Sequence, residues 1–163
     1  MMQLHDDNLI HNSALASLLL TTFVRAFEES SAHTERPDFL KLLLVLPIVW
    51  HQASCDEVRR RQFDTPLHAV LSDYPQIKTD FRERISAFAP VTGRALNVAC
   101  ATKLLRRDAG DEENPVFSIN FSRWPQGSKP TKAPPEMLQA IDRLAIWYAR
   151  ESTAQLYSRF LTN

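Results

Sequence analysis

Two residues have the types and spacing of a metal site, but the sequence does not complete one. His51 and Cys55 are four residues apart, so on one helix face their nitrogen and sulfur could both reach a metal ion. Structural zinc sites have four ligands as a rule, and no second pair follows in the sequence. The two residues also straddle an expected helix end. We therefore expect no metal ion and no cofactor here.

A cysteine and a run of carboxylates are two further candidates for catalytic residues, and the sequence around each argues against that role. Cys100 lies near Thr102 and Lys103 on an expected helix, but no histidine is near it in the sequence to act as a base. Asp111–Glu113 is a run of carboxylates in a turn-rich loop, where it lacks the fixed geometry that acid–base or metal chemistry needs. The sequence contains no nucleotide-binding, metalloprotease or serine-hydrolase motif. We expect that the chain is not an enzyme.

Clusters of basic residues are the main candidates for contact with DNA or with an acidic partner surface. They are Arg59, Arg60 and Arg61, and Lys103, Arg106 and Arg107. The guanidinium group binds phosphate or carboxylate through two parallel hydrogen bonds, which favours a binding role. Alternatively, the arginine triplet is simply solvated, and the second cluster stabilises the carbonyl end of a helix. Both interpretations stay open.

Trp147 is a further candidate for partner contact. It precedes Tyr148 in the closing helical segment, and adjacent helix residues point about 100° apart. If Tyr148 follows Leu144 and Ile141 into the core, Trp147 is turned outward and can anchor a partner. The alternative is that Trp147 is buried against the preceding linker, since tryptophan is mostly buried in proteins.

The composition predicts a single cytoplasmic domain that is mainly helical. The 163 residues fit one domain, and three glycines are too few for a many-stranded fold or a phosphate loop. Nineteen basic and nineteen acidic residues cancel, which weakens the case for a free-standing nucleic-acid binder. The two cysteines form no Cys-x-x-Cys pair, so we expect reduced thiols. The most apolar run, Phe39–Trp50, is too short to span a bilayer, and we expect no membrane contact.

Hydrophobic spacing predicts the helices that position these candidates. One amphipathic helix runs from a cap at Ser13 or Asn12 to about Ser30. The run Phe39–Trp50 is apolar nearly all round and predicts a core helix that Pro47 kinks or ends, with a buried strand as the competing interpretation. Thr65-Pro66, Pro75 and Pro90 each predict the start of a further helix.

A short hairpin is predicted after these helices. Phe117, Ile119 and Phe121 alternate with polar residues, which is typical of a strand, and a partner strand is expected at about residues 104–107. A helix followed by two strands resembles the wing of a winged helix. We therefore expect a winged-helix-like helical domain over residues 1–122, a linker over 123–135 and a C-terminal helical segment over 136–163 that packs on the same domain.

Five segments in order along the chain carry a family resemblance. They are Asn12-Ser13-Ala14, Leu46–His51, Phe81–Arg84, Pro90–Leu96 and Leu144–Ala149. Together they resemble the middle component of bacterial three-component ABC-ATPase conflict systems, which include the small accessory subunit of Lamassu-type defence. The likeness covers about residues 12–160. Ser13 replaces a proline of the family pattern and Ala145 replaces a glycine, so details of partner contact can differ.

The resemblance implies a non-catalytic subunit that bridges and restrains larger partners. These are an SMC- or Rad50-like ABC ATPase and an effector, often a nuclease, in anti-phage or anti-plasmid defence. DNA would be touched only indirectly or weakly. The alternative hypothesis, from the basic clusters and the expected wing, is a stand-alone winged-helix DNA-binding regulator.

Overall fold

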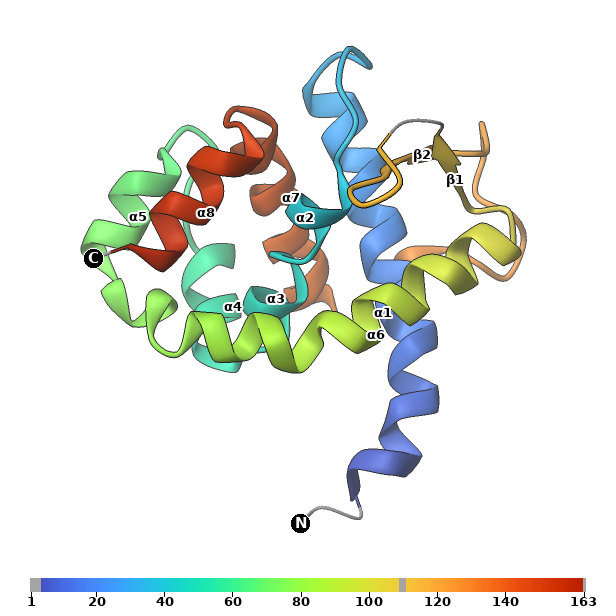
Figure 1. The fold of residues 1–163 in the computed structure, drawn as a ribbon, viewed down its shortest axis with the longest axis horizontal. Coiled ribbons are helices and arrows are strands. Elements are labelled where there is room, and N and C mark those ends of the chain that lie inside the picture. Colours follow the sequence, from blue (N-terminus) through green and yellow to red (C-terminus); the bar gives the residue numbers. More distant parts are fainter. Residues whose placement is uncertain (1–3, 109–110, 163) are drawn as a thin grey trace.

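The computed structural model describes residues 4–108 and 111–162, with the side chains of the first helix described from residue 13 onward. The chain is mainly helical, with one antiparallel hairpin and a helical C-terminal segment, as predicted. The elements in chain order (Figure 1) are α1 (Leu4–Ser30), α2 (Phe39–Leu42), α3 (Leu46–Val49), α4 (Gln52–Arg59), α5 (Leu67–Asp73), the 3-10 helix η1 (Pro75–Lys78), α6 (Phe81–Ala101), β1 (Leu105–Asp108), β2 (Val116–Ile119), the 3-10 helix η2 (Pro130–Lys132), α7 (Pro135–Ala149) and α8 (Thr153–Leu161).

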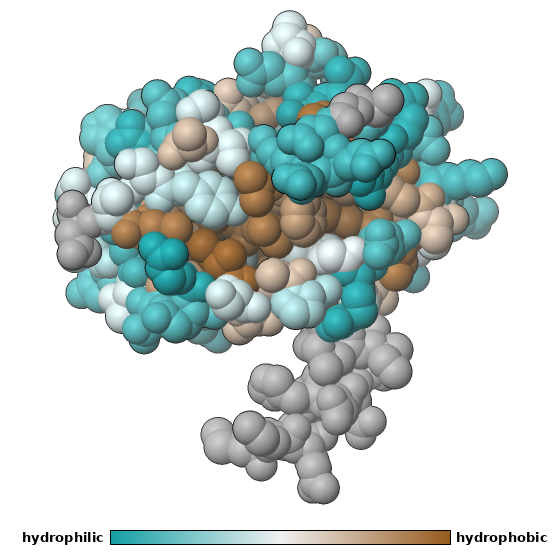
Figure 2. All heavy atoms as spheres, viewed as in Figure 1, coloured by the Kyte–Doolittle hydropathy of each residue, from teal (hydrophilic) through white to brown (hydrophobic). Residues whose placement is uncertain are grey.

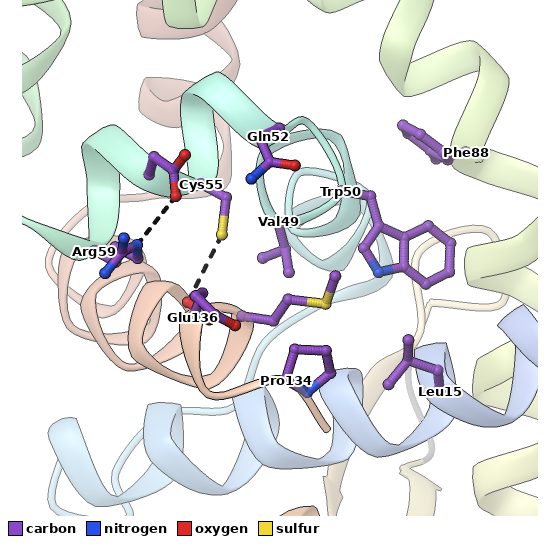
Figure 3. A pocket seen from close by; sticks show the side chains of 11 residues that line it. Leu15, Val49, Trp50, Gln52, Cys55, Arg59, Phe88, Pro134 and Glu136 are labelled. Carbon is purple, nitrogen blue, oxygen red and sulfur yellow. Dashed lines mark hydrogen bonds and ion pairs between the residues drawn. The ribbon is translucent and has the colours of Figure 1, made fainter. Parts of the chain in front are cut away.

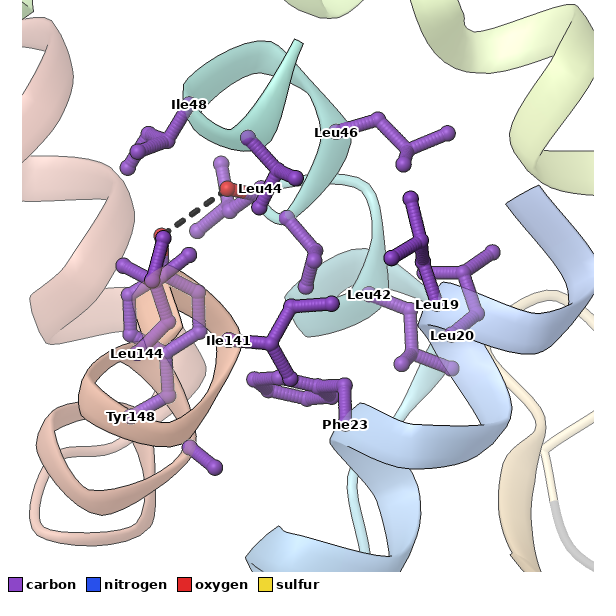
Figure 4. Close-up of a cluster of buried hydrophobic side chains, with 14 of the residues drawn as sticks. Leu19, Leu20, Phe23, Leu42, Leu44, Leu46, Ile48, Ile141, Leu144 and Tyr148 are labelled. Carbon is purple, nitrogen blue, oxygen red and sulfur yellow. Dashed lines mark hydrogen bonds between the residues drawn. The ribbon is translucent and has the colours of Figure 1, made fainter. Parts of the chain in front are cut away.

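The core forms where α1 packs against both α6 and α7. The expected amphipathic face of α1 is confirmed, although the helix begins at Leu4 rather than at Ser13. Phe23 is fully buried, and its ring centroid lies 5.9 Å from that of Phe27 and 5.8 Å from that of Tyr148 (Figure 4). Burying such aromatic side chains supplies much of the hydrophobic free energy that holds these helices together.

The single core helix predicted over Phe39–Trp50 is wrong, as is the alternative strand. The segment folds as two short helices, α2 and α3, joined by a turn, and Pro47 lies in the first turn of α3. A proline in that position costs little, because the first helical N–H groups have no partner within the helix. The turn leaves the Leu44 carbonyl free to accept a hydrogen bond from the buried Tyr148 Oη at 2.8 Å (Figure 4). A tertiary contact thus decides this local structure.

By length and composition, none of the described helices could cross a membrane by itself. One pair passes such a test when it is taken together, Phe39–Val49 with Gln52–Arg59, and its halves are bent by 99°.

The separate helix expected to begin at Pro90 does not exist. The chain forms η1 at Pro75 and then one long helix, α6, in which Pro90 is an interior residue. Proline normally breaks a helix by removing a backbone donor and crowding the preceding turn. Here Pro90 is exposed, so water can solvate the carbonyl that it leaves unpaired, while Val91 and Ala95 are buried on the opposite side. Packing of that buried side carries the helix through the proline.

The hairpin forms as predicted, but β1 begins one residue later than expected and Phe121 lies outside β2. β1 pairs antiparallel with β2, and Leu105 lies opposite Ile119. The segment before α2 adds to the other edge of β2, because Asp38 forms a bridge with Val116. Phe39 N donates to Pro115 O at 2.8 Å beside this bridge. Residues 109–110 of the predicted acidic loop lie outside the described residues.

Asp38 and Lys41 connect that same segment to the C-terminal helices. Asp38 Oδ1 accepts a hydrogen bond from Lys41 N at 2.8 Å and so caps α2, while Asp38 Oδ2 accepts one from Thr153 Oγ1 at 2.8 Å. The buried Lys41 ammonium donates to the carbonyls of Tyr148 at 3.0 Å and Glu151 at 2.9 Å, where α7 ends. The segment from Asp38 to Lys41 therefore holds the hairpin and the α7–α8 junction together.

The C-terminal segment consists of two helices, α7 and α8. Ser152 caps α8 in a reciprocal arrangement with Gln155, which is a strong helix start. In the expected linker, the Trp124 ring packs beside Phe121 with 4.7 Å between ring centroids, and the Arg25 guanidinium lies 5.7 Å from the Trp124 centroid. These contacts fasten the linker to α1. The expected division of the chain at 122 and 135 stays a prediction.

Alkaline pH is expected to destabilise the fold through Tyr148. Burial raises the pKa of Tyr148 well above its usual value, and burial also raises the pKa of Tyr157 to about 12. Above pH 10 the unfolded chain loses these protons while the folded chain keeps them. The free energy of unfolding therefore falls by about 1.4 kcal/mol per pH unit for each such tyrosine. Urea titrations between pH 9 and pH 12 measure this slope, and Tyr148→Phe should have a shallower one. Equal slopes in the two proteins would contradict the assignment.

Candidate functional site

The described residues form a cleft with a volume of about 790 Å³. Its walls come from α1, the α3–α4 turn, α6 and the start of α7 (Figure 3). The lining residues are Leu15, Val49, Trp50, Gln52, Cys55, Asp56, Arg59, Phe88, Pro134, Glu136 and Met137. A volume in this range is typical of ligand-binding clefts.

The cleft has an apolar interior built around two aromatic rings. Trp50 and Phe88 meet edge to face, with 5.7 Å between ring centroids and 78° between planes. Leu15, Val49 and Pro134 lie around them in Figure 3. The Trp50 Nε1 atom is buried and has no hydrogen-bond partner among the described residues. Figure 3 shows this nitrogen on the side of the ring that faces the cleft.

The rim of the cleft is polar and mostly paired. Arg59 Nε lies 3.1 Å from Asp56 Oδ1, and this hydrogen bond lowers the pKa of the Asp56 carboxyl. The Gln52 side chain also hydrogen-bonds to Asp56. Glu136 is exposed in the first turn of α7, where the helix dipole favours a negative charge. The rim therefore offers one internal ion pair and one further carboxylate.

His51 and Cys55 have structural roles. His51 is the N-cap of α4, with its Nδ1 2.7 Å from Ser54 Oγ, and burial lowers its pKa. Cys55 is buried with its Sγ 3.7 Å from Glu136 O, and burial raises the pKa of its thiol to about 11. Because the thiolate is the reactive form, such a thiol is a poor nucleophile. Within the described residues, no three His, Cys, Asp or Glu side chains are grouped so that they could hold a metal ion.

The arginine triplet divides into three different environments. Arg59 belongs to the cleft rim and pairs with Asp56. Arg61 pairs with Glu57 at 2.6 Å and with Asp73 at 3.2 Å. Arg60 is exposed, and no ion pair or hydrogen bond of its side chain is found among the described residues. Of the triplet, Arg60 is thus the residue free to contact a partner.

The second basic cluster lies around the hairpin, away from the first. Lys103 is exposed just after α6, in the left-handed region with φ of 65°. Arg106 Nε pairs with Asp108 at 2.9 Å, and Arg107 Nη2 donates to Glu112 O at 3.2 Å. Figure 1 places α4 and β1 far apart along α6, so the two clusters do not form one continuous basic surface.

The outward interpretation of Trp147 is wrong, because its side chain is only 1% exposed. α5 begins over it, and Pro66 and Leu67 line a small pocket together with Trp147. The adjacent residues Trp147 and Tyr148 are therefore both buried, each against a different part of the fold. Trp147 cannot anchor a partner in this conformation.

Phe63 is an exposed aromatic residue that the sequence analysis missed. It is 46% exposed in the loop after α4. The Arg143 guanidinium lies 4.5 Å from its ring centroid, and Arg143 Nε donates to Arg61 O at 3.0 Å. In the sequence, a single aromatic residue within a polar stretch could have indicated that Phe63 is exposed. Aromatic and arginine side chains are enriched at the centres of protein interfaces.

Apolar residues also reach the surface elsewhere. Leu40 is 39% exposed and Val98 is 40% exposed. Figure 2 shows an apolar band across the middle of one face, between polar margins. Contiguous apolar surface of this kind is typical of proteins that bind other proteins.

The family comparison covers nearly the whole chain. Residues 4–161 match the family model described as ABC-three component (ABC-3C) system Middle Component 3. Comparisons with curated proteins and with solved structures gave no match.

Proposed function

Because the chain belongs to the ABC-three component system Middle Component 3 family, we propose that it is a non-catalytic subunit that joins an ABC ATPase to an effector. The family match over residues 4–161 is the observation that carries this proposal. It implies that the chain works with the other components of such a system. The poorly nucleophilic thiol of Cys55 and the structural role of His51 fit a subunit that acts by binding.

The finer part of the proposal concerns the partners and the way they are controlled. The ordered motifs of the sequence support an SMC- or Rad50-like ATPase on one side and an effector nuclease on the other, in a Lamassu-type defence system. The subunit bridges the two and restrains the effector. When the ATPase rearranges on foreign DNA, the restraint is released. Exposed Phe63 and Arg60, together with the cleft, are the surfaces available for these contacts.

A stand-alone DNA-binding regulator is the second candidate. The hairpin directly after α6, with Asp38 bridged to its second strand, favours it, since a wing follows the recognition helix in winged-helix proteins. The exposed side of α6 does not favour it. Arg82 and Arg94 are accompanied there by Glu83 and by apolar Val98, whereas phosphate binding needs a basic excess.

Co-expression with the products of neighbouring genes tests the leading proposal. We expect the chain to co-elute with the adjacent ATPase and effector in gel filtration, because a bridging subunit binds both. Arg60→Glu is the test variant: it reverses the charge of the exposed arginine, so it should weaken co-elution and leave folding unchanged.

Three separate elution peaks would contradict the bridging role. The rival function predicts a different result, in which the isolated chain shifts DNA in a gel at low salt and loses the shift at higher salt. ATP hydrolysis or nuclease activity by the purified chain alone would contradict both.

A further inference from the structure

The cleft between α1, α4, α6 and α7 has features of a peptide-binding site. We infer that it binds an extended apolar segment of a partner protein, with a backbone carbonyl of that segment accepting a hydrogen bond from Trp50 Nε1. This inference rests on the proposed function, because it takes the partner from the same three-component system. Beyond the proposed function, it specifies which surface of the chain binds the partner and which interactions recognise it.

The unpartnered Trp50 N–H is the first argument. A buried donor without an acceptor costs free energy, so its persistence in a cleft wall points to an acceptor supplied from outside. Met137 lines the same cleft, and its flexible side chain can move aside to open the path to this nitrogen. A bound carbonyl oxygen would then satisfy Trp50.

The Trp50 N–H needs a free carbonyl oxygen as its acceptor, and this favours an extended partner segment. Within an α-helix the backbone carbonyls already accept hydrogen bonds, except in the last turn. An extended or polyproline segment presents free carbonyls along its whole length, and grooves lined by aromatic rings bind such segments. Trp50, Phe88 and Pro134 provide a lining of that kind. An amphipathic helix could pair with the Trp50 N–H only through a carbonyl of its last turn.

The charged residues at the rim of the cleft indicate which side chains the bound partner segment should have. Asp56 and Arg59 neutralise each other, so the rim has no unpaired cation for a phosphate or another anionic small molecule. Glu136 is exposed at the start of α7, with no ion pair among the described residues. The complementary segment has one large apolar side chain for the Trp50–Phe88 wall and a lysine or arginine near Glu136.

Short overlapping peptides covering the neighbouring ATPase and effector are the probes, and fluorescence anisotropy measures their binding to the full chain. Gln52→Trp places a large ring in the cleft from an exposed rim position, and we expect it to weaken binding at least about tenfold, which corresponds to about 1.4 kcal/mol. Ala53→Trp is the matched control, because Ala53 is exposed on the same turn but does not line the cleft; its binding should stay within about twofold.

Trp50→Phe tests the hydrogen bond itself. It keeps an aromatic wall and removes the N–H, so we expect binding to weaken about three- to tenfold. A merely structural role of Trp50 would leave peptide binding unchanged.

The outcomes separate this inference from the proposed function. If the three-component complex forms but no peptide binds, or if binding survives Gln52→Trp, the cleft inference is wrong while the bridging role stands. A dimer of the isolated chain that Gln52→Trp disrupts would make a second copy the occupant and would also overturn the inference. If no complex forms at all, the proposed function itself fails.

Discussion

Arg84→Ala is expected to lower the free energy of unfolding by about 3 kcal/mol, since each hydrogen bond to a charged group contributes about 1.5–3 kcal/mol and the contributions do not add fully. The half-buried Arg84 guanidinium donates to Pro47 O at 2.6 Å and to Thr79 O at 3.0 Å, and it also donates to Ile77 O. It lies 5.0 Å from the centroid of the Phe81 ring. One side chain thus fastens α3 and η1 to α6.

Two further variants make the Arg84 prediction specific. Arg84→Lys keeps the charge but loses the planar fork, so it should bind fewer of these carbonyls and give an intermediate loss. Arg82→Ala is the matched control on the same helix, because Arg82 is exposed, and it should stay within about 0.5 kcal/mol of the wild type. Urea unfolding measures all three. A similar loss for Arg82→Ala and Arg84→Ala would contradict the role given to Arg84.

Lys41→Met is expected to lower the free energy of unfolding by about 2–4 kcal/mol. Methionine keeps the apolar stem of the side chain but leaves the carbonyls of Tyr148 and Glu151 without their buried donor, and an unsatisfied buried acceptor costs about 1–3 kcal/mol. The Lys41 ammonium also lies 5.1 Å from the Phe27 ring centroid. Burial lowers the pKa of Lys41, while the negative charge of Asp38 opposes that shift.

The control for Lys41 is another lysine. Lys132 is exposed and donates only a long hydrogen bond to Gly127 O at 3.5 Å, so Lys132→Met should change the free energy of unfolding by less than about 0.5 kcal/mol. Thermal and urea unfolding of both variants make the comparison. If Lys41→Met were as stable as the wild type, the ammonium would not be holding the end of α7.

Patterns local in sequence were predictable in this chain. The amphipathic face of α1 and the alternating residues of β2 each follow from a few neighbouring residues. The family could be recognised as well, because its motifs occur in order along the chain. Among these motifs, the segment Phe81–Arg84 contains the arginine whose hydrogen bonds join three elements.

Features that depend on distant residues were not predictable. Pro90 was expected to begin a helix, and only the packing of Val91 and Ala95 on the core keeps α6 continuous. Trp147 is buried because α5, far away in the sequence, covers it. The cleft is the clearest case, since its walls at Leu15, Trp50, Phe88 and Met137 come from four separate parts of the chain.

Helix α2 has a mechanical consequence. Phe39 N donates a hydrogen bond to Pro115 O of the hairpin loop, and Leu40 N donates one to Asn114 Oδ1. The Lys41 ammonium donates one to Tyr148 O at the end of α7. A load applied to the hairpin is therefore transmitted through three consecutive residues to the C-terminal helices. A force that displaces the hairpin would therefore also displace the junction of α7 and α8, without unfolding of the core.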